Sequence, residues 1–313
     1  MDAPPRRAER QGLWAALTIP GTAWLIVLFV VPFYAIAAVA FGGFDPILLA
    51  PEPTWNPLRW RFDAARDVLD SVVAGPLRSV FVRTLAYVGL SMALCFAIGY
   101  PVAYYVARRA GRWRTLLLVC LILPFWVSYL MRMLAWVNLL NPEGGWASAA
   151  LNAIGAATLF EWVGLSDGSE VWFGQPVTVV FGLVYGYVPF FILPLYASLD
   201  RIDQRLLEAS RDLGASPIAT FVRVTLPLSV PGILAASVIT ALPMFGDYYT
   251  NTILSGSPRT EMVGNQIESL TRTIEPQRGS VLVLVLSALL FVLMAYYMRI
   301  TIRANREASE ARA

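Results

Sequence analysis

Residues 206–217 read Leu206-Leu207-Glu208-Ala209-Ser210-Arg211-Asp212-Leu213-Gly214-Ala215-Ser216-Pro217, a short stretch with charged residues between two long apolar runs. The stretch predicts a short helix, a sharp stop and the start of a second helix. Asp203 stands where its side chain would cap the first helix, and Gly214 stands where a left-handed residue would end it. Ser216 followed by Pro217 is typical of the N-cap and first position of the next helix.

The first of these two helices is predicted to have two different faces. Leucine and small residues share one face because they are three or four positions apart, namely Leu206, Ala209, Ser210 and Leu213. The charged residues Glu208, Arg211 and Asp212 lie on the others. A helix of about ten residues is marginal alone in water, so it must pack against something. Such a face suits docking into a groove of a partner, while the alternative is a connector that rests on its own bundle.

Long apolar runs surround this stretch and predict an integral membrane protein. Of 313 residues, 57% are hydrophobic and only 14% are charged, and the mean hydropathy is +0.60. Six runs are each long enough to cross a bilayer as a helix: 13–41, 80–107, 115–140, 176–199, 228–249 and 280–301. Pro227 is expected to mark the entry into the fifth run. The first run is too long for a signal-peptide core, which favours a retained helix over a cleaved signal.

The absence of two residue types excludes several classes of function. The sequence has no histidine, and all 24 of its basic residues are arginine. Without lysine it has no P-loop lysine, so any ATP hydrolysis must come from another polypeptide. Without histidine it has no Ser-His-Asp triad and lacks the commonest metal ligand, so we expect no catalytic residues and no metal site. The two cysteines, Cys95 and Cys120, lie in apolar runs and indicate no disulfide.

The distribution of arginine predicts the orientation. Fifteen arginines lie in the amino tail, the second and fourth loops and the carboxyl end, whereas seven lie in the alternate loops. The positive-inside rule therefore places both termini in the cytoplasm. The predicted organisation is a cytoplasmic tail (1–12), a first transmembrane helix (13–41), an external loop with a surface helix (42–79), a five-helix core (80–301) that contains the cytoplasmic loop 200–226, and a second cytoplasmic tail (302–313). The surface helix either covers the outer mouth of the bundle or docks an external partner.

The cytoplasmic loop also carries a family resemblance. Glu208-Ala209-Ser210, Gly214 after three more residues, and Leu226-Pro227 after eleven further residues resemble the EAA-loop signature of permease subunits of binding-protein-dependent ABC importers. Ser210 stands in place of the second alanine, and Val224 fills the hydrophobic position. The resemblance implies the six-helix fold of type I (MetI-like) ABC importer permeases, with both termini inside.

Two further stretches resemble the spermidine/putrescine permease group, and the long amino-terminal run favours its PotB/PotH-like subunit. One contains Leu123-Pro124-Phe125-Trp126, Ser128, Leu130, Arg132 and Ala135-Trp136, and the other spans 182–200. Together the resemblance covers residues 80–300. It implies half of a translocation path completed by a second, PotC/PotI-like permease subunit, in the inner membrane of a bacterium. It also implies an ATPase dimer that holds ATP and Mg, an extracytoplasmic substrate-binding protein, and no cofactor on this chain.

The resemblance assigns the coupling to the ATPase to Leu206, Glu208, Ala209, Ser210, Asp212, Leu213 and Gly214. Glu208 would offer a charge to the groove rim, Ala209 would allow close approach, and Gly214 would aim the helix. We expect no nucleic-acid partner.

A polyamine path needs carboxylates and aromatic faces. Asp247, near the end of the fifth run beside Tyr248, is either such a carboxylate or an aspartate at the outer interface. The other path candidates are Trp126, Tyr129 and Tyr185, with Trp136 and Tyr187 considered beside them. An interfacial role is the alternative for all five. Arg132 argues against a purely cation-attracting path unless it has a structural partner. Gly182 and Gly186 form a GxxxG pair that predicts close helix packing.

Three alternatives remain open at this point. The same architecture could import another small solute, such as ferric iron, thiamine or an aminophosphonate. An ion-driven secondary transporter is less favoured, since the sequence shows no clear inverted repeat and few acids within the runs. A membrane enzyme is disfavoured by the missing histidine.

Overall fold

The computed structural model describes residues 7–45, 50–272 and 275–310. The chain forms two compact units, one of Met1–Val73 with Ile267–Ser287 and the other of Ala74–Gln266 with Ala288–Ala313. Within the described residues, five helices are long and apolar enough to cross a membrane, and a sixth candidate is a bent pair of helices. The fold is therefore helical with five or six spans, in agreement with the six predicted runs.

The first unit begins with α1 (Arg7–Ala40), whose candidate span Thr18–Ala40 exposes apolar side chains such as Trp24 and Phe29. A short antiparallel pair follows, β1 (Gly43–Asp45) and β2 (Ala50–Glu52), and this pair was not predicted. Next come η1 (Pro57–Arg59) and α2 (Asp63–Val73), which confirms the predicted helix of the 42–79 loop. The Phe41 ring lies 4.9 Å from the rings of both Trp60 and Phe62, so aromatic contacts hold the loop on the end of α1.

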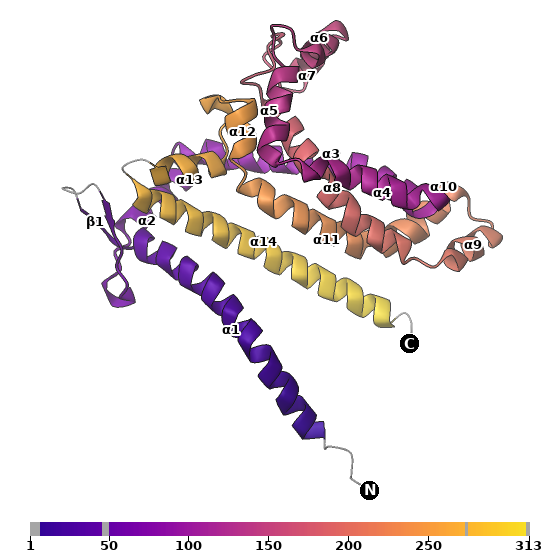
Figure 1. Cartoon of the computed structure of the whole chain (residues 1–313), viewed down its shortest axis with the longest axis horizontal. Coiled ribbons are helices and arrows are strands. Elements are labelled where there is room, and N and C mark those ends of the chain that lie inside the picture. Colours follow the sequence, from indigo (N-terminus) through magenta and orange to yellow (C-terminus); the bar gives the residue numbers. More distant parts are fainter. Residues whose placement is uncertain (1–6, 46–49, 273–274, 311–313) are drawn as a thin grey trace. The chain divides into compact units, whose positions relative to one another are not determined.

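The second unit is built on three spans that pack side by side (Figure 1): α3 (Leu77–Arg108), α8 (Pro176–Asp200) and α11 (Leu226–Phe245). Helix α8 is the most enclosed, and its Leu183, Phe191 and Leu195 have no exposed surface. Because lipid tails are as apolar as leucine, such helices associate through close packing and a few hydrogen bonds. One of these bonds joins the hydroxyls of Tyr100 on α3 and Ser229 on α11 at 2.9 Å.

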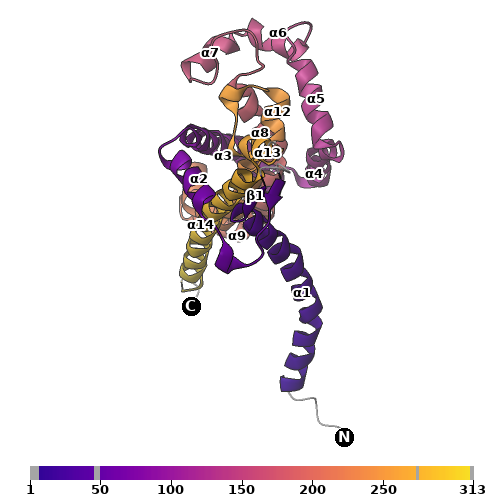
Figure 2. The same cartoon turned by 90° about the vertical axis from the view of Figure 1, so that its left-hand side faces the viewer.

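The third predicted run is not a single straight helix. It divides into η2 (Gly111–Trp113), α4 (Arg114–Ile122), η3 (Leu123–Trp126) and α5 (Tyr129–Leu139), with a bend of 87° between the two parts (Figure 2). Pro124 cannot donate a helical hydrogen bond, and Val127 is extended. The Ser128 hydroxyl then accepts a hydrogen bond from the Met131 N–H and starts α5. The prediction of one continuous helix over 115–140 was wrong for this reason.

The fifth span also differs from its prediction, since Pro227 does not mark a break. Helices α10 (Pro217–Thr220), η4 (Phe221–Thr225) and α11 form one candidate span, Pro217–Phe245. The η4 segment is a π-helix, in which the Leu226 N–H reaches back five residues to the Phe221 carbonyl. This wider turn lets the helix pass a proline, which has no N–H to donate. The helix ends at Phe245 rather than at residue 249, so Asp247 and Tyr248 follow the span instead of lying in it.

Shorter helices complete the described chain. The 141–175 segment, which was predicted only as a loop, contains α6 (Trp146–Ala153) and α7 (Ala156–Trp162) around a small core with Leu140 and Trp172. The remaining elements are α9 (Gln204–Asp212), α12 (Tyr249–Leu254), η5 (Pro258–Thr260), α13 (Val263–Arg272) and α14 (Pro276–Glu310). Most of the predicted carboxyl-terminal tail, 302–310, continues α14, while 311–313 and residues 1–6 of the amino tail lie outside the described residues.

Candidate functional site

The loop between α8 and α11 has the predicted local structure. The Asp203 side chain caps α9 by accepting a hydrogen bond of 2.9 Å from the Arg205 N–H. Gly214 ends the turn with a φ of +85°, a conformation that costs other residues about 1–2 kcal/mol. The Ser216 hydroxyl accepts a hydrogen bond from the Ala219 N–H ahead of Pro217. Both caps and the left-handed glycine confirm the physical interpretation of this stretch.

The faces of α9 are divided differently from the prediction. Leu207 is buried, and the Ser210 hydroxyl lies 3.2 Å from the Thr220 hydroxyl, so these two residues tie α9 to its own unit. Leu206 is 51% exposed and Leu213 is 89% exposed, and both are large apolar side chains. Other exposed residues of the predicted coupling set are Glu208, Ala209, Asp212 and Gly214. A partner could therefore contact the exposed side chains of Leu206 and Leu213 and the charged groups beside them, whereas Ser210 has an internal contact.

Two arginines hold the base of this loop. Arg108, the last residue of α3, donates from Nη2 to the carbonyl oxygens of Leu199 and Ile202, both at 2.8 Å. Arg114 Nη2 lies 2.6 Å from Asp200 Oδ2, and its guanidinium lies 4.9 Å from the Tyr196 ring centre. A cation at the carboxyl end of a helix is favourable because the last carbonyls lack intrahelical partners. These contacts join the end of α8, directly before α9, to α3 and α4.

The second candidate region centres on the buried carboxylate of Asp247, which is 7% exposed and lies between α11 and α12. Its Oδ1 accepts a hydrogen bond from the Thr250 N–H at 2.9 Å. Its Oδ2 accepts bonds from the Thr250 hydroxyl at 2.7 Å and the Tyr187 hydroxyl at 3.1 Å, and the Tyr129 hydroxyl lies 3.3 Å away. The Tyr129 hydroxyl also contacts the Thr250 hydroxyl and has one proton, which it donates either to Thr250 or to Asp247. The buried carboxylate therefore has hydrogen-bond donors on both of its oxygens.

The two glycines of the predicted packing motif make room for this cluster. A Cβ at Gly182 would lie 2.5 Å from side-chain atoms of Thr250 and Leu254 on α12. A Cβ at Gly186 would lie 2.8 Å from the ring of Tyr129 on α5. Both distances are shorter than a real Cβ contact allows. The small residues of α8 therefore admit α12 and the Tyr129 ring of the same chain, and they position two donors to Asp247.

Arg132 on α5 lies close to the Asp247 cluster without an ion pair to it. Its guanidinium lies over the rings of Phe125, Tyr129 and Tyr185, at 4.1, 5.6 and 5.7 Å from their centres. The side chain is 9% exposed, and its Nε and Nη1 have no hydrogen-bond partner among the described residues. A desolvated cation–π contact contributes about 2 kcal/mol, whereas each buried donor left unpaired costs about 1–3 kcal/mol.

A cavity of about 340 Å³ connects these groups. Its wall contains Tyr129, Arg132, Gly186, Tyr187, Phe190, Pro243, Gly246, Asp247, Tyr248 and Tyr249. The Tyr248 and Tyr249 rings stack with their centres 4.1 Å apart. The cavity has the size range of small-ligand sites and combines aromatic faces with one acid and one base.

Comparison with known proteins shows which family the chain matches. The family described as binding-protein-dependent transport system inner membrane component matches residues 99–303. The chain belongs to this family. It is a permease component of an ABC importer and a multi-pass protein of the inner membrane. The family match does not favour an ion-driven secondary transporter.

Two relatives of the permease are spermidine/putrescine transport system permease proteins, both named PotB. The protein from Escherichia coli (strain K12) is 31% identical over 256 residues, which are 80% of this chain and 83% of that protein. The protein from Haemophilus influenzae is 36% identical over 187 residues, 60% of this chain and 62% of that protein. The fold also resembles a chain in the crystal structure of a bacterial alginate ABC transporter in complex with an alginate-bound periplasmic protein. The TM-score is 0.62 and the sequences are 18% identical, and the match covers 97% of this chain and 96% of that chain. At that identity the likeness concerns the fold alone.

The permease brings together most of the predicted path residues, with one exception. Tyr129, Asp247 and Tyr248 line the cavity, and Tyr185 lies against Arg132. Trp126 is 83% exposed and is not part of the cavity wall, whereas its neighbour Phe125 contacts Arg132. Sequence reasoning missed Thr250, although an aspartate three residues before a threonine is a common capping arrangement. Tyr187 was considered beside Tyr185 as an aromatic residue of the fourth run, and in the structure it donates to Asp247.

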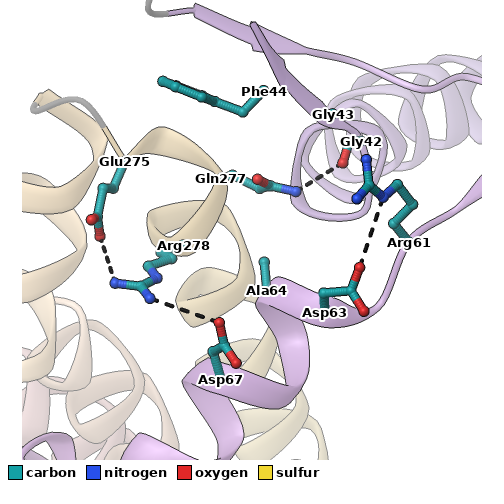
Figure 3. A pocket seen from close by; sticks show the side chains of 10 residues that line it. All are labelled: Gly42, Gly43, Phe44, Arg61, Asp63, Ala64, Asp67, Glu275, Gln277 and Arg278. Atoms are coloured by element: carbon teal, nitrogen blue, oxygen red, sulfur yellow. Dashed lines mark hydrogen bonds and ion pairs between the residues drawn. The ribbon is translucent and has the colours of Figure 1, made fainter. Parts of the chain in front are cut away.

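The first unit of the permease contains a separate polar cavity of about 510 Å³, shown in Figure 3. Arg278 lies 3.0 Å from Glu275 and 3.8 Å from Asp67, and Arg61 lies 3.8 Å from Asp63. Gln277 donates a hydrogen bond to the Gly42 carbonyl. All three ion pairs are exposed to solvent, so they contribute little stability. Both arginines of this cavity have acidic partners, and we assign it no part in substrate recognition.

Proposed function

We propose that this permease forms half of the translocation path of a polyamine importer, with a second permease subunit as the other half. The observation that carries the proposal is the buried Asp247 carboxylate, which stands with tyrosine rings in one cavity directly after the fifth span. Carboxylates and aromatic faces are the groups that attract ammonium ions. The names of the PotB relatives, spermidine/putrescine permeases, support the same substrate class.

The α9 loop is the proposed contact with an ATPase subunit, which would bind ATP and Mg in place of this chain. Leu206 and Leu213 offer exposed apolar surface, and Glu208 and Asp212 stand beside them. A short capped helix of this kind fits a groove on a partner. The arginine distribution supports a cytoplasmic location for this loop, with both chain termini on the same side. An external binding protein would deliver the substrate to the opposite face.

Radiolabelled putrescine uptake by vesicles that contain the complete complex tests the proposal. Asp247→Asn should reduce uptake at low substrate concentration about tenfold, because asparagine has the same shape as aspartate but no negative charge to attract an ammonium ion. Asp70→Asn is the matched control, since Asp70 is an exposed residue of α2. Co-purification of the ATPase subunit shows that each variant assembles. Normal uptake by Asp247→Asn would remove this carboxylate from the path.

A further inference from the structure

The cavity beside Asp247 has more unmet capacity to donate hydrogen bonds than to accept them. Asp247 Oδ2 accepts hydrogen bonds from the Thr250 and Tyr187 hydroxyls and lies within reach of the Tyr129 hydroxyl, and Oδ1 accepts one bond from the Thr250 N–H. A carboxylate has about two acceptor sites on each oxygen, so about one site, on Oδ1, remains open to a ligand. Arg132, in contrast, has five N–H donors, and its Nε and Nη1 are buried with no partner among the described residues. A ligand that brings only ammonium groups would satisfy the smaller of these two needs.

The ring contacts hold Arg132 without satisfying its hydrogen bonds. Three aromatic rings surround the guanidinium, and no carboxylate of the described residues lies within ion-pair distance of it. A guanidinium held in this way can turn toward an incoming carboxylate without breaking a hydrogen bond. Arginine and carboxylate form two parallel N–H···O bonds when they meet edge to edge.

Another part of the same wall suits an ammonium group. Asp247 supplies the negative charge, and the stacked rings of Tyr248 and Tyr249 lie next to it. The titratable groups that line this cavity are Asp247, Arg132 and the tyrosines Tyr129, Tyr187, Tyr248 and Tyr249. The acid and the base share the contact with Tyr129 but form no ion pair with each other. One cavity therefore presents a separated negative and positive charge.

We propose that the cavity binds an ω-amino carboxylate, a ligand with an ammonium at one end and a carboxylate at the other end of a short aliphatic chain. Asp247 and the tyrosine rings take the ammonium, and Arg132 takes the carboxylate. The cavity of about 340 Å³ has room for a chain of a few methylene groups between them. This inference rests on the proposed function only in treating the cavity as part of the translocation path, and it extends the range of substrates beyond polyamines.

Equilibrium binding to the purified complex in nanodiscs, without any external binding protein, tests the inference. The probes are 4-aminobutyrate, n-butylamine and butyrate, which share one chain length and differ only in their end groups. We expect 4-aminobutyrate to bind about tenfold more tightly than either single-charge probe. Arg132→Gln should reduce this advantage to within about twofold by weakening 4-aminobutyrate binding, while n-butylamine binding is retained or tightened because a nearby positive charge is removed. Arg132→Lys, which keeps the charge but loses the forked geometry, should retain part of the advantage.

The outcomes separate this inference from the proposed function. If 4-aminobutyrate binds no more tightly than n-butylamine, or if Arg132→Gln keeps the full preference, the inference is wrong. If the same complex, reconstituted in vesicles with its external binding protein, still takes up putrescine, the polyamine proposal survives that result. A complex that binds 4-aminobutyrate but transports no putrescine supports the inference and overturns the polyamine assignment. Size-exclusion chromatography and the retained n-butylamine binding show that Arg132→Gln is folded.

Discussion

Replacing Arg108 by methionine should loosen the base of the α9 loop. The arginine donates to the carbonyl oxygens of Leu199 and Ile202 at 2.8 Å each, and methionine has a similar length but no donor. A hydrogen bond that involves a charged group contributes about 1.5–3 kcal/mol, and both bonds share one nitrogen, so we expect a loss of about 2 kcal/mol. This corresponds to an increase of about 30-fold in the local opening equilibrium.

Hydrogen exchange of the assembled complex measures this opening directly. Peptides that cover residues 199–207 should exchange about 30-fold faster in Arg108→Met, while peptides from the middle of α8 should not change. Arg112→Met is the matched control, because Arg112 is exposed and its ring contact is with the adjacent Trp113. The variant should also hydrolyse ATP with less uptake per ATP, since the loop is no longer tied to α3. If Arg108→Met exchanges no faster than Arg112→Met at residues 199–207, the proposed anchor does not exist.

Three further predictions concern other parts of the molecule. Gly214→Pro and Glu208→Lys should both lower uptake-coupled ATPase activity. Proline cannot adopt the φ of +85° found at Gly214, and lysine reverses an exposed charge at position 208. Unchanged coupling in reconstituted vesicles would contradict the docking role. Gly186→Val should displace the Tyr129 ring, which should lower the free energy of unfolding by about 1–3 kcal/mol and reduce substrate binding. The control is Gly89→Val, at a position where no atom lies within 4 Å of the added Cβ. Hydrogen bonds involving the Ser169 side chain, Gln175 and the Ser169 N–H lower the pKa of Asp167 to about 2, so the segment 166–175 should keep its protection above about pH 4 and lose it as the pH falls toward 2. Pepsin cleavage at pH 4 and pH 2 measures this, and Asp167→Asn should be cleaved at pH 4 as readily as the parent chain at pH 2.

The fold was largely readable from the sequence because span formation depends on long apolar runs. The breaks within those runs were harder to place. Pro124 and Pro227 both lie at the start of an apolar helix, yet the first accompanies a bend of 87° and the second is absorbed by a π-turn. The difference lies in the neighbouring residues, since Ser128 caps a new helix after the first proline and no cap follows the second.

The sequence predicted those parts of the candidate site that depend on residues close to one another in the chain. Asp203, Gly214 and Ser216 act within a few residues of their own positions, and their roles followed from capping rules. The donors to Asp247 come from α5, α8 and α12, and no spacing in the sequence brings them together. The same limit applies to Gly186, whose need for a missing Cβ appears only when the Tyr129 ring is in place.

The continuous helix Pro217–Phe245 has a mechanical consequence for the permease. Its 29 residues span roughly 43 Å at 1.5 Å per residue, so it is a rod with the α9 loop at one end and Asp247 two residues beyond the other. An axial rotation imposed at Ser216 would reach Gly246 through the π-turn and past Pro231 and Pro243, which each lack a helical hydrogen bond and can absorb part of the twist. Motion at the opposite side of the bilayer can therefore reach the cavity along this helix, together with α8, which supplies Gly186, Tyr187 and Phe190 to the cavity wall.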